Sequence, residues 1–489
     1  MNLTKRIGLV LGPLLFTIIT LFFKPEDLSP QANAILASTA WIAIWWITEA
    51  IPIAATALLP IVLFPLTSSL NIASTTASFG HKFVFLYLGG FIIAIAIEKW
   101  NLHKRIALNI INIIGSDVQK IILGFMVATA FLSMWISNTA TSVMMLPIGI
   151  AIIKQLKDNP KTEEDENLIF GKALMLAIAY SASIGGISTL IGTPPNLVLA
   201  GIVSATYGYE ITFSQWFIFG FPISIILLII CWKYLTRFAF SFKQKEFPGG
   251  KEEIKRLLKS LGKMTYEEKI VAIVFAVTAF CWITRSFLLK HILPQIDDTI
   301  IAILFALILF LIPSKTKHKN IISWKDTKDL PWGLILLFGG GMALAKGFES
   351  SGLALWIGNQ MTTLEGVSTI VLIFLLIAAV NFLTEITSNL ATTAMLLPVL
   401  APMAVTIDIH PLILMVGAAV AASCAFMLPV ATPPNAVVFG SGYLRIVDMV
   451  SKGIIMNIIS IIILTLFVYL VLPELWYILI QGFPASFKN

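Results

Sequence analysis

Charged residues are scarce in this chain of 489 residues, making up only 12% of the sequence. Soluble domains average about 25% charged residues, so a soluble fold of this length would lack the polar groups that its surface needs. Long polar stretches are scarce as well, whereas strongly apolar residues make up 58% of the chain. These shortages exclude a soluble enzyme, a nucleic-acid-binding domain and a disordered protein.

Cysteine and histidine are also few. The three cysteines lie inside apolar runs, and the five histidines are scattered at segment ends with no two at helical i, i+4 spacing. Neither a disulfide framework nor a metal centre is expected from such spacing. The sequence contains no H-E-x-x-H motif, no nucleotide-binding loop and no Ser/His/Asp set. We therefore expect no enzyme activity and no cofactor.

What the sequence does contain is apolar runs long enough to cross a hydrocarbon core of about 30 Å. We predict an all-α polytopic membrane protein with about 11 transmembrane helices and two re-entrant hairpins. The hairpins are expected at 121–153 and 367–407, where Ser-Asn and Pro interrupt the apolar stretch. The expected crossings are 7–23, 35–50, 51–66, 83–98, 168–202, 212–236, 268–289, 296–313, 332–349, 411–440 and 451–472.

The distribution of Lys and Arg predicts the orientation of the chain. With the N-terminus in the cytoplasm, most of the 33 basic residues fall in cytoplasmic segments, as the positive-inside rule requires. Those left outside are Lys24, Lys82, Arg285, Lys290, Lys346 and Lys488. This bias predicts an N-in, C-out topology. Short loops without glycosylation sequons on the outer side favour a bacterial cytoplasmic membrane.

The chain contains an internal repeat. Residues 131–147 match 382–398 without a gap, and the same offset relates Gly89–Leu102 to Gly340–Leu353. Further along, Thr-Pro-Pro-Asn occurs in both halves. Basic residues flank the first hairpin but not the second, so the two copies are expected to have opposite orientations. Inverted repeats of this kind are typical of secondary transporters.

We expect five parts along the chain. Residues 1–66 are expected to form the first helices, which belong largely to a scaffold, and residues 67–240 the first inverted repeat, with a hairpin open to the cytoplasm. Residues 241–267 are expected to form a basic cytoplasmic linker. Residues 268–472 are expected to form the second inverted repeat, with a hairpin open outward, and residues 473–489 an external C-terminal tail.

Two features break apolar helices in each half, namely Ser-Asn at the hairpin tip and Thr-Pro-Pro-Asn downstream. Adjacent prolines unwind a helix, and non-helical backbone at membrane depth occurs only where it is buried or lines a wet cavity. Helix N-termini favour anions, and released carbonyl groups suit Na⁺. Because these segments contain no Lys or Arg, the residues favour an anion with a bound cation, although a neutral polar solute would also fit.

At these motifs, and at Trp46–Pro52, the sequence resembles the divalent anion–sodium symporter family, which carries dicarboxylates, citrate and sulfate, and in particular its bacterial dicarboxylate transporters. The resemblance covers nearly the whole chain. It implies Na⁺ as coupling ion, a homodimer in the lipid bilayer, and a transport domain that moves like an elevator against a scaffold domain to give alternating access.

The resemblance also implies functional residues. Substrate would contact Ser137, Asn138, Thr139, Thr193, Ser388, Asn389, Leu390, Thr432 and Pro433. The first Na⁺ site would use Ser133, Ser137, Asn138 and the backbone of Gly192, and the second Thr384, Thr387, Asn389 and the backbone of Ala431. One departure is Leu390, because the family's Ser-Asn-Thr is intact only in the first copy. It bears on which anion fits best.

The leading functional hypothesis is Na⁺-coupled uptake of a C4 dicarboxylate such as succinate, malate or fumarate. Alternatives are Na⁺-independent exchange of di- or tricarboxylates, and sulfate or citrate symport on the same fold. Glu49 and Glu385 are ionisable residues at or near membrane depth, where a functional role is the default hypothesis. For Glu385, bracing the hairpin is favoured over relaying a proton.

Overall fold

The computed structural model describes residues 3–115, 117–155, 166–242, 250–316, 320–360, 367–482, 484 and 487. Over these residues the chain is almost entirely helical, and no strand forms. Seven of the described helices are long and apolar enough to span a membrane, and further shorter apolar helices accompany them. The prediction of an all-α membrane protein is therefore confirmed.

The N-terminal part consists of α1 (Leu3–Phe22), α2 (Pro30–Thr48), α3 (Ile53–Thr56), α4 (Leu59–Leu66) and α5 (Ile72–Ala77). The expected crossing at 51–66 is two short helices, because the chain turns between Thr56 and Leu59 and a proline occupies the first turn of α4. Helix α1 packs closely on α2 through Gly8 and Gly12, a small-xxx-small pair. A Cβ added at Gly8 would lie 2.0 Å from the Thr48 hydroxyl oxygen, so only glycine permits this approach.

The internal repeat reappears as two series of helices in the same order. The first series is α6 (Lys82–Lys99), α7 (Leu102–Ile114), α8 (Val118–Ser133), α9 (Asn138–Ile153), α10 (Glu166–Gly186), α11 (Pro194–Tyr207) and α12 (Phe213–Lys233). The second series is α17 (Trp332–Ser351), α18 (Leu353–Gln360), α19 (Thr369–Leu383), α20 (Asn389–Thr406), α21 (Pro411–Ala421), α22 (Pro433–Phe439) and α23 (Ile446–Leu466). A short π-helix ends both series, at Tyr234–Ala239 and Phe467–Val471.

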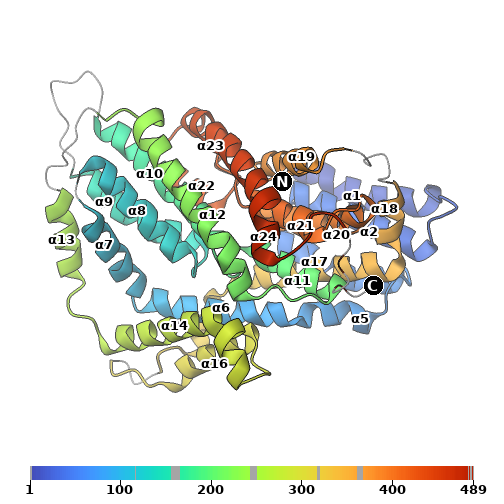
Figure 1. Cartoon of the computed structure of the whole chain (residues 1–489), viewed down its shortest axis with the longest axis horizontal. Coiled ribbons are helices and arrows are strands. Elements are labelled where there is room, and N and C mark those ends of the chain that lie inside the picture. Colours follow the sequence, from blue (N-terminus) through green and yellow to red (C-terminus); the bar gives the residue numbers. More distant parts are fainter. Residues whose placement is uncertain are drawn as a thin grey trace.

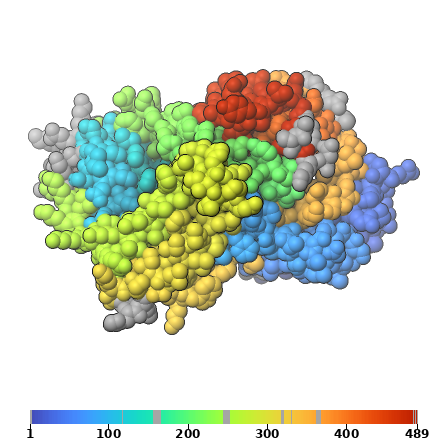
Figure 2. Space-filling view, turned by 60° about the horizontal axis from the view of Figure 1, so that its bottom comes forward, coloured from blue at the N-terminus to red at the C-terminus, as the bar shows by residue number. Residues whose placement is uncertain are grey.

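Between the two series lie α13 (Gly250–Ser260), α14 (Tyr266–Thr284), α15 (Lys290–Ile292) and α16 (Asp298–Leu311), and α24 (Leu472–Trp476) follows the second. Figure 1 shows α7 to α10 and α13 at one end of the molecule, with α1, α2 and α18 at the other. Figure 2 shows a second face, where the residues of α14 to α16, in yellow, lie in the middle and the N-terminal helices, in dark blue, lie at the right-hand end.

The predicted breaks fall where the prolines are. The expected spans 168–202 and 411–440 are each two helices, joined by non-helical residues at 187–193 and 422–432. Helices α7, α13 and α18 were not predicted as separate elements. Residues 243–249 of the predicted linker, and residues 483, 485, 486, 488 and 489 of the predicted tail, lie outside the described residues.

A charged cluster joins the ends of four segments. Arg285, at the end of α14, contacts Asp298 at 2.9 Å and Glu210 at 2.8 Å, and Lys82 contacts Glu210 at 3.1 Å and Asp297 at 3.3 Å. Arg285 and Asp298 are buried. Since an unpaired buried charge is costly, this cluster fixes α6, α14 and α16 against the loop that precedes α12.

Candidate functional site: a cavity between the two hairpin tips

A cavity of about 930 Å³ lies where both hairpin tips and both helix breaks meet. The hairpin tips contribute Ser137, Asn138 and Thr139, and Thr387, Ser388, Asn389 and Leu390. The breaks contribute Gly192 to Pro195 and Pro429 to Pro434. The rest of the wall comes from α1, α2, α6 and α17, through residues that include Lys5, Trp46, Glu49, Tyr87 and Leu334.

Local sequence explains why the helices begin at this cavity. Ser137 ends the turn after α8, and its hydroxyl accepts the Ala140 amide at 3.2 Å, which caps α9. Helix α20 also begins directly after a serine, Ser388, although that side chain makes no capping hydrogen bond. Helices α11 and α22 begin with Pro-Pro, a favoured first turn because those positions need no amide partner. Four helix N-termini, each carrying the partial positive charge of its helix dipole, therefore meet at the cavity.

Oxygen atoms gather behind the first hairpin tip. The Ser133 hydroxyl donates to the Ala182 carbonyl at 2.7 Å. One terminal atom of the Asn138 amide lies 2.6 Å from Ser133 Oγ and 3.2 Å from the carbonyl oxygens of Ala182 and Gly192. With its nitrogen there, the amide donates to all three oxygens. With its oxygen there, four oxygens converge, which is the ligand set that a hard cation such as Na⁺ prefers.

The second hairpin repeats this arrangement. The Thr384 hydroxyl donates to Asn389 Oδ1 at 2.6 Å and to the Ala422 carbonyl at 3.1 Å. Beside it, the hydroxyls of Thr387 and Thr392 lie 2.6 Å apart. The two copies therefore place equivalent hydroxyl, amide and carbonyl groups together although they are far apart in the sequence.

The structure brings the residues predicted from the sequence to one place. All nine predicted substrate residues line the cavity. Of the predicted Na⁺ ligands, Ser133 and Thr384 do not line it but lie behind it, in contact with Asn138 and Asn389. Hydroxyl and amide oxygens at these positions are of the ligand type that hard cations prefer.

Comparison with known proteins identifies the family. The sequence pattern described as "Sodium:sulfate symporter transmembrane region" matches residues 3–481. The chain belongs to this family. The resemblance found from the Ser-Asn and Thr-Pro-Pro-Asn motifs is thereby confirmed, and the protein is a transporter rather than an enzyme.

Curated relatives agree with the family. The chain is 51% identical over 478 residues to the sodium-dependent dicarboxylate transporter SdcS of Staphylococcus saprophyticus, covering 96% of this chain and 92% of that one. It is 53% identical over 475 residues to SdcS of Staphylococcus aureus strain USA300, covering 96% and 91%. This member of the symporter family is accordingly an integral protein of a bacterial cytoplasmic membrane.

Two solved membrane transporters share the fold. The chain superimposes on MtrF of Neisseria gonorrhoeae with a TM-score of 0.59 at 14% identity, covering 96% of both chains. It superimposes on YdaH of Alcanivorax borkumensis with a TM-score of 0.57 at 13% identity, covering 88% of this chain and 97% of that one. At such identities the likeness concerns the fold alone.

In this symporter the non-helical segments beside the cavity are clamped by asparagines that the sequence interpretation did not single out. The Asn196 amide donates to the Thr189 carbonyl at 2.7 Å and to the Gly186 carbonyl at 3.2 Å. In the second repeat the Asn435 amide donates to the Leu428 carbonyl at 3.0 Å. The last residue of each Thr-Pro-Pro-Asn motif therefore shapes the break, and its duplication in the sequence was the available signal.

Glu385 holds the second break in place. Its carboxylate accepts the backbone amides of Phe426 at 2.8 Å, Met427 at 3.0 Å and Leu428 at 3.0 Å, and the Asn457 side chain at 2.7 Å. A buried carboxylate needs such donors. This geometry supports bracing, the role favoured from the sequence.

The fold also brings charge to the cavity from a distant segment. Lys5 of α1 and Glu49 after α2 line it, and they are the only charged residues among the described lining residues. Because the four motifs contain no Lys or Arg, they did not indicate that the Lys5 ammonium lines the cavity. The closest sequence signal was the Gly8–Gly12 spacing, which predicts close helix packing but does not name the partner helix.

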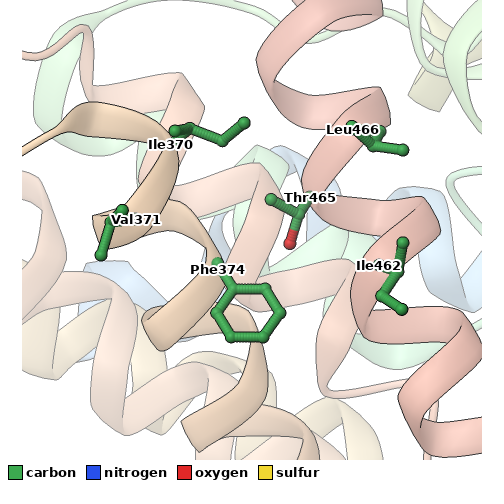
Figure 3. A pocket seen from close by; sticks show the side chains of 6 residues that line it. All are labelled: Ile370, Val371, Phe374, Ile462, Thr465 and Leu466. Carbon is green, nitrogen blue, oxygen red and sulfur yellow. The ribbon is translucent and has the colours of Figure 1, made fainter.

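A second hollow, of about 310 Å³, is of a different kind. Its lining residues come from α19 and α23 (Figure 3) and are Ile370, Val371, Phe374, Ile462, Thr465 and Leu466. The Thr465 hydroxyl already donates to its own helix at 2.8 Å. With no other polar side chain in its lining, this hollow does not suit a polar substrate.

Proposed function

We propose that this protein is a Na⁺-coupled symporter of C4 dicarboxylates such as succinate, malate and fumarate. The observation that carries the proposal is the single cavity in which two equivalent Ser-Asn tips meet, each backed by a cluster of oxygen atoms. Relatives named sodium-dependent dicarboxylate transporters, at 51% and 53% identity, support the choice of ion and substrate.

The duplicated geometry suits a substrate with two carboxylates. One carboxylate would meet Ser137, Asn138, Thr139 and Thr193, and the other Ser388, Asn389, Thr432 and Pro433, with Leu390 forming an apolar contact. The hydroxyls, side-chain amides and helix N-termini at these positions supply hydrogen-bond donors and partial positive charge.

Coupling would come from sharing the asparagine amides. With its oxygen turned to the cluster, Asn138 would join Ser133, Ser137 and the Gly192 carbonyl in binding Na⁺, while its nitrogen faces the substrate. Asn389, Thr384, Thr387 and the Ala431 carbonyl would do the same in the second repeat. Bound Na⁺ thus orients the amides as donors and offsets the substrate charge, and the substrate in turn favours Na⁺ binding, as linkage requires.

We further infer the architecture implied by the family resemblance and the basic-residue bias. The carrier would have an N-in, C-out topology with inverted repeats. It would work as a homodimer in which the part that carries the hairpins moves across the membrane against a scaffold that includes the N-terminal helices. The short helices and unwound breaks at the cavity support alternating access because such elements surround midplane sites in other secondary transporters.

Uptake of radiolabelled succinate into proteoliposomes tests the proposal. We expect an inward Na⁺ gradient to drive accumulation into vesicles without internal succinate, and an equal K⁺ gradient not to do so. Uptake that ignores Na⁺ but requires internal dicarboxylate would make the protein an exchanger. Sulfate or citrate competing better than malate would make it a symporter for those anions.

A further inference from the structure

Lys5 and Glu49 introduce charge into a cavity that is otherwise lined by neutral described residues. The Lys5 ammonium lies 3.4 Å from a Glu49 carboxylate oxygen. Both belong to the part of the wall that α1 and the end of α2 contribute, outside the hairpin tips and the helix breaks. They are therefore separate from the Ser-Asn and Thr-Pro-Pro-Asn groups assigned above to substrate and Na⁺.

Close helix packing fixes the position of Lys5. Gly8 lies against Thr48 and Gly12 against Trp41 and Trp45. The Trp45 indole also donates to the Gly8 carbonyl at 3.0 Å. Since Lys5 precedes Gly8 by less than one helical turn and Glu49 directly follows Thr48, the same packing that joins α1 to α2 places the two charges side by side.

The backbone after α2 turns Glu49 away from the helix. Glu49 follows the last residue of α2 in the left-handed conformation, with φ 47° and ψ 43°. Non-glycine residues adopt this region infrequently. The carboxylate consequently leaves the path of α2 and meets Lys5 at the cavity wall.

The pair is open to solvent, unlike the buried pair of Arg285 and Asp298. The Lys5 side chain is 39% exposed and that of Glu49 is 56% exposed. An ion pair in such surroundings is weak and exchanges partners readily. Lys5 can therefore exchange the Glu49 carboxylate for a carboxylate of an anion that enters the cavity.

We propose that Lys5 is a substrate-contacting residue at the mouth of the cavity, and that Glu49 is the counter-ion that a dicarboxylate displaces. The proposal rests on the proposed function, because it assumes a dianionic substrate. Lys5 attracts the dianion to the mouth and pairs with one carboxylate, while the other advances to a Ser-Asn tip. When the substrate is released, Glu49 pairs with Lys5 again, so that Lys5 does not retain the leaving anion.

The mouth that carries this pair faces the cytoplasm. Lys5 lies near the start of the first helix, which the distribution of Lys and Arg assigns to the inner side. The pair should therefore affect the KM for dicarboxylate at the cytoplasmic face and leave the KM at the external face unchanged. This sidedness distinguishes a mouth residue from a residue of the central site.

The test compares the two faces of the full-length carrier in membrane vesicles. Na⁺-driven succinate uptake is measured in right-side-out and inside-out vesicles of wild type, Lys5→Gln, Lys5→Arg, Glu49→Gln and the control Arg6→Gln. Arg6 carries the same charge on the adjacent residue, but it is exposed and does not line the cavity. Ionic strength is varied with choline chloride at constant Na⁺.

We expect Lys5→Gln to raise the KM for succinate about fivefold at the cytoplasmic face and to weaken the salt dependence of that KM, since one steering charge is lost. Lys5→Arg should keep the wild-type KM. Glu49→Gln should lower the KM, because the competing carboxylate is gone. Arg6→Gln should change neither quantity.

An unchanged cytoplasmic KM in Lys5→Gln, or a reduced kcat without a change in KM, would overturn the role of Lys5 in substrate contact. A shift of KM at the external face alone would overturn the position of the mouth. These outcomes differ from failure of the proposed function, in which wild type itself would show no Na⁺-driven succinate uptake in either vesicle type.

Discussion

Ser133 and Thr384 occupy equivalent positions in the two repeats and make equivalent hydrogen bonds. Each hydroxyl lies 2.6 Å from the side-chain amide of the asparagine five positions later, Asn138 or Asn389. Each also donates to an alanine carbonyl near the start of the break, that of Ala182 at 2.7 Å in the first repeat and that of Ala422 at 3.1 Å in the second. These matching hydrogen bonds do not follow from an identical residue at the two positions, because one residue is Ser and the other is Thr. The shared element is a hydroxyl oxygen behind an amide at the cavity wall.

Ser133→Ala should have a larger effect on the activation of succinate uptake by Na⁺ than on the stability of the fold. Removing one oxygen from the cluster should raise the Na⁺ concentration for half-maximal succinate uptake about tenfold, which corresponds to about 1.4 kcal/mol. The measurement is a Na⁺ titration of uptake at fixed succinate.

Thr129→Ala provides the matched control. Thr129 is buried on the same helix α8, but its hydroxyl donates only to the Phe125 carbonyl of that helix, at 2.6 Å. We expect its Na⁺ activation to match wild type. If both variants shift Na⁺ activation equally, the effect comes from α8 packing and Ser133 is not a cation ligand.

Glu385→Gln should destabilise the second break. The carboxylate accepts three backbone amides from 426–428, and the Gln amide nitrogen would face some of these donors instead of accepting from them. A lost hydrogen bond to a charged group costs about 1.5–3 kcal/mol. We expect a lower thermal unfolding temperature in detergent and reduced uptake, with the exposed Glu349→Gln as control.

The residual activity of Glu385→Gln separates bracing from proton relay. A brace predicts that the Na⁺ to succinate ratio and the pH dependence of the remaining uptake are those of wild type. A changed ratio, or a pH dependence that disappears with the carboxylate, would show that Glu385 takes part in coupling.

Much of the candidate site could be predicted because it is duplicated in the sequence. A single Ser-Asn or Thr-Pro-Pro-Asn in an apolar run also suits a helix contact or a kink, whereas ordered copies in both halves indicate a shared role. Proline chemistry then predicts a break at each Thr-Pro-Pro-Asn, and the structure has it directly before each proline pair, at 187–193 and 422–432. The structure has both segments non-helical, and it brings all four motifs to one cavity.

What the sequence could not show depends on tertiary contacts between distant segments. The five Glu385 hydrogen bonds that brace the break involve groups far along the chain, and no local pattern connects them. The approach of Lys5 to the cavity depends on which helix Gly8 and Gly12 pack against. Likewise, the bend between α3 and α4 divides an apolar run that periodicity alone interprets as one crossing.

The cluster around Glu210 predicts acid sensitivity. Burial alone would raise the pKa of Glu210, but Arg285 and Lys82 outweigh it and hold the pKa below its usual value. A lowered pKa in the folded state stabilises the protein above the unfolded pKa of about 4.3, and this stability is lost as pH falls through the folded value. We expect the unfolding temperature in detergent to fall below about pH 4.

Glu210→Gln should lower the unfolding temperature at neutral pH and flatten its decline in acid, because the titrating partner of Arg285 has been removed. Glu474→Gln changes an exposed carboxyl on α24 and serves as the control. An acid profile of Glu210→Gln that is the same as that of wild type would mean that other carboxylates dominate the transition.

Within the Ser-Asn-Thr triplet the two hairpin tips differ at one position, where Thr139 in the first repeat corresponds to Leu390 in the second, and both line the cavity. Leu390 cannot donate a hydrogen bond, and its side chain contributes apolar surface to the cavity. We expect Leu390→Thr to raise the preference for malate over succinate about tenfold, because the new hydroxyl can pair with the malate hydroxyl whereas succinate leaves it unpaired. Thr139→Leu should weaken binding of both substrates without this change in preference. Competition of unlabelled malate and succinate against labelled succinate measures the ratio directly. Equal losses for both anions in Leu390→Thr would show that position 390 only fills space and that selectivity among C4 dicarboxylates is set elsewhere.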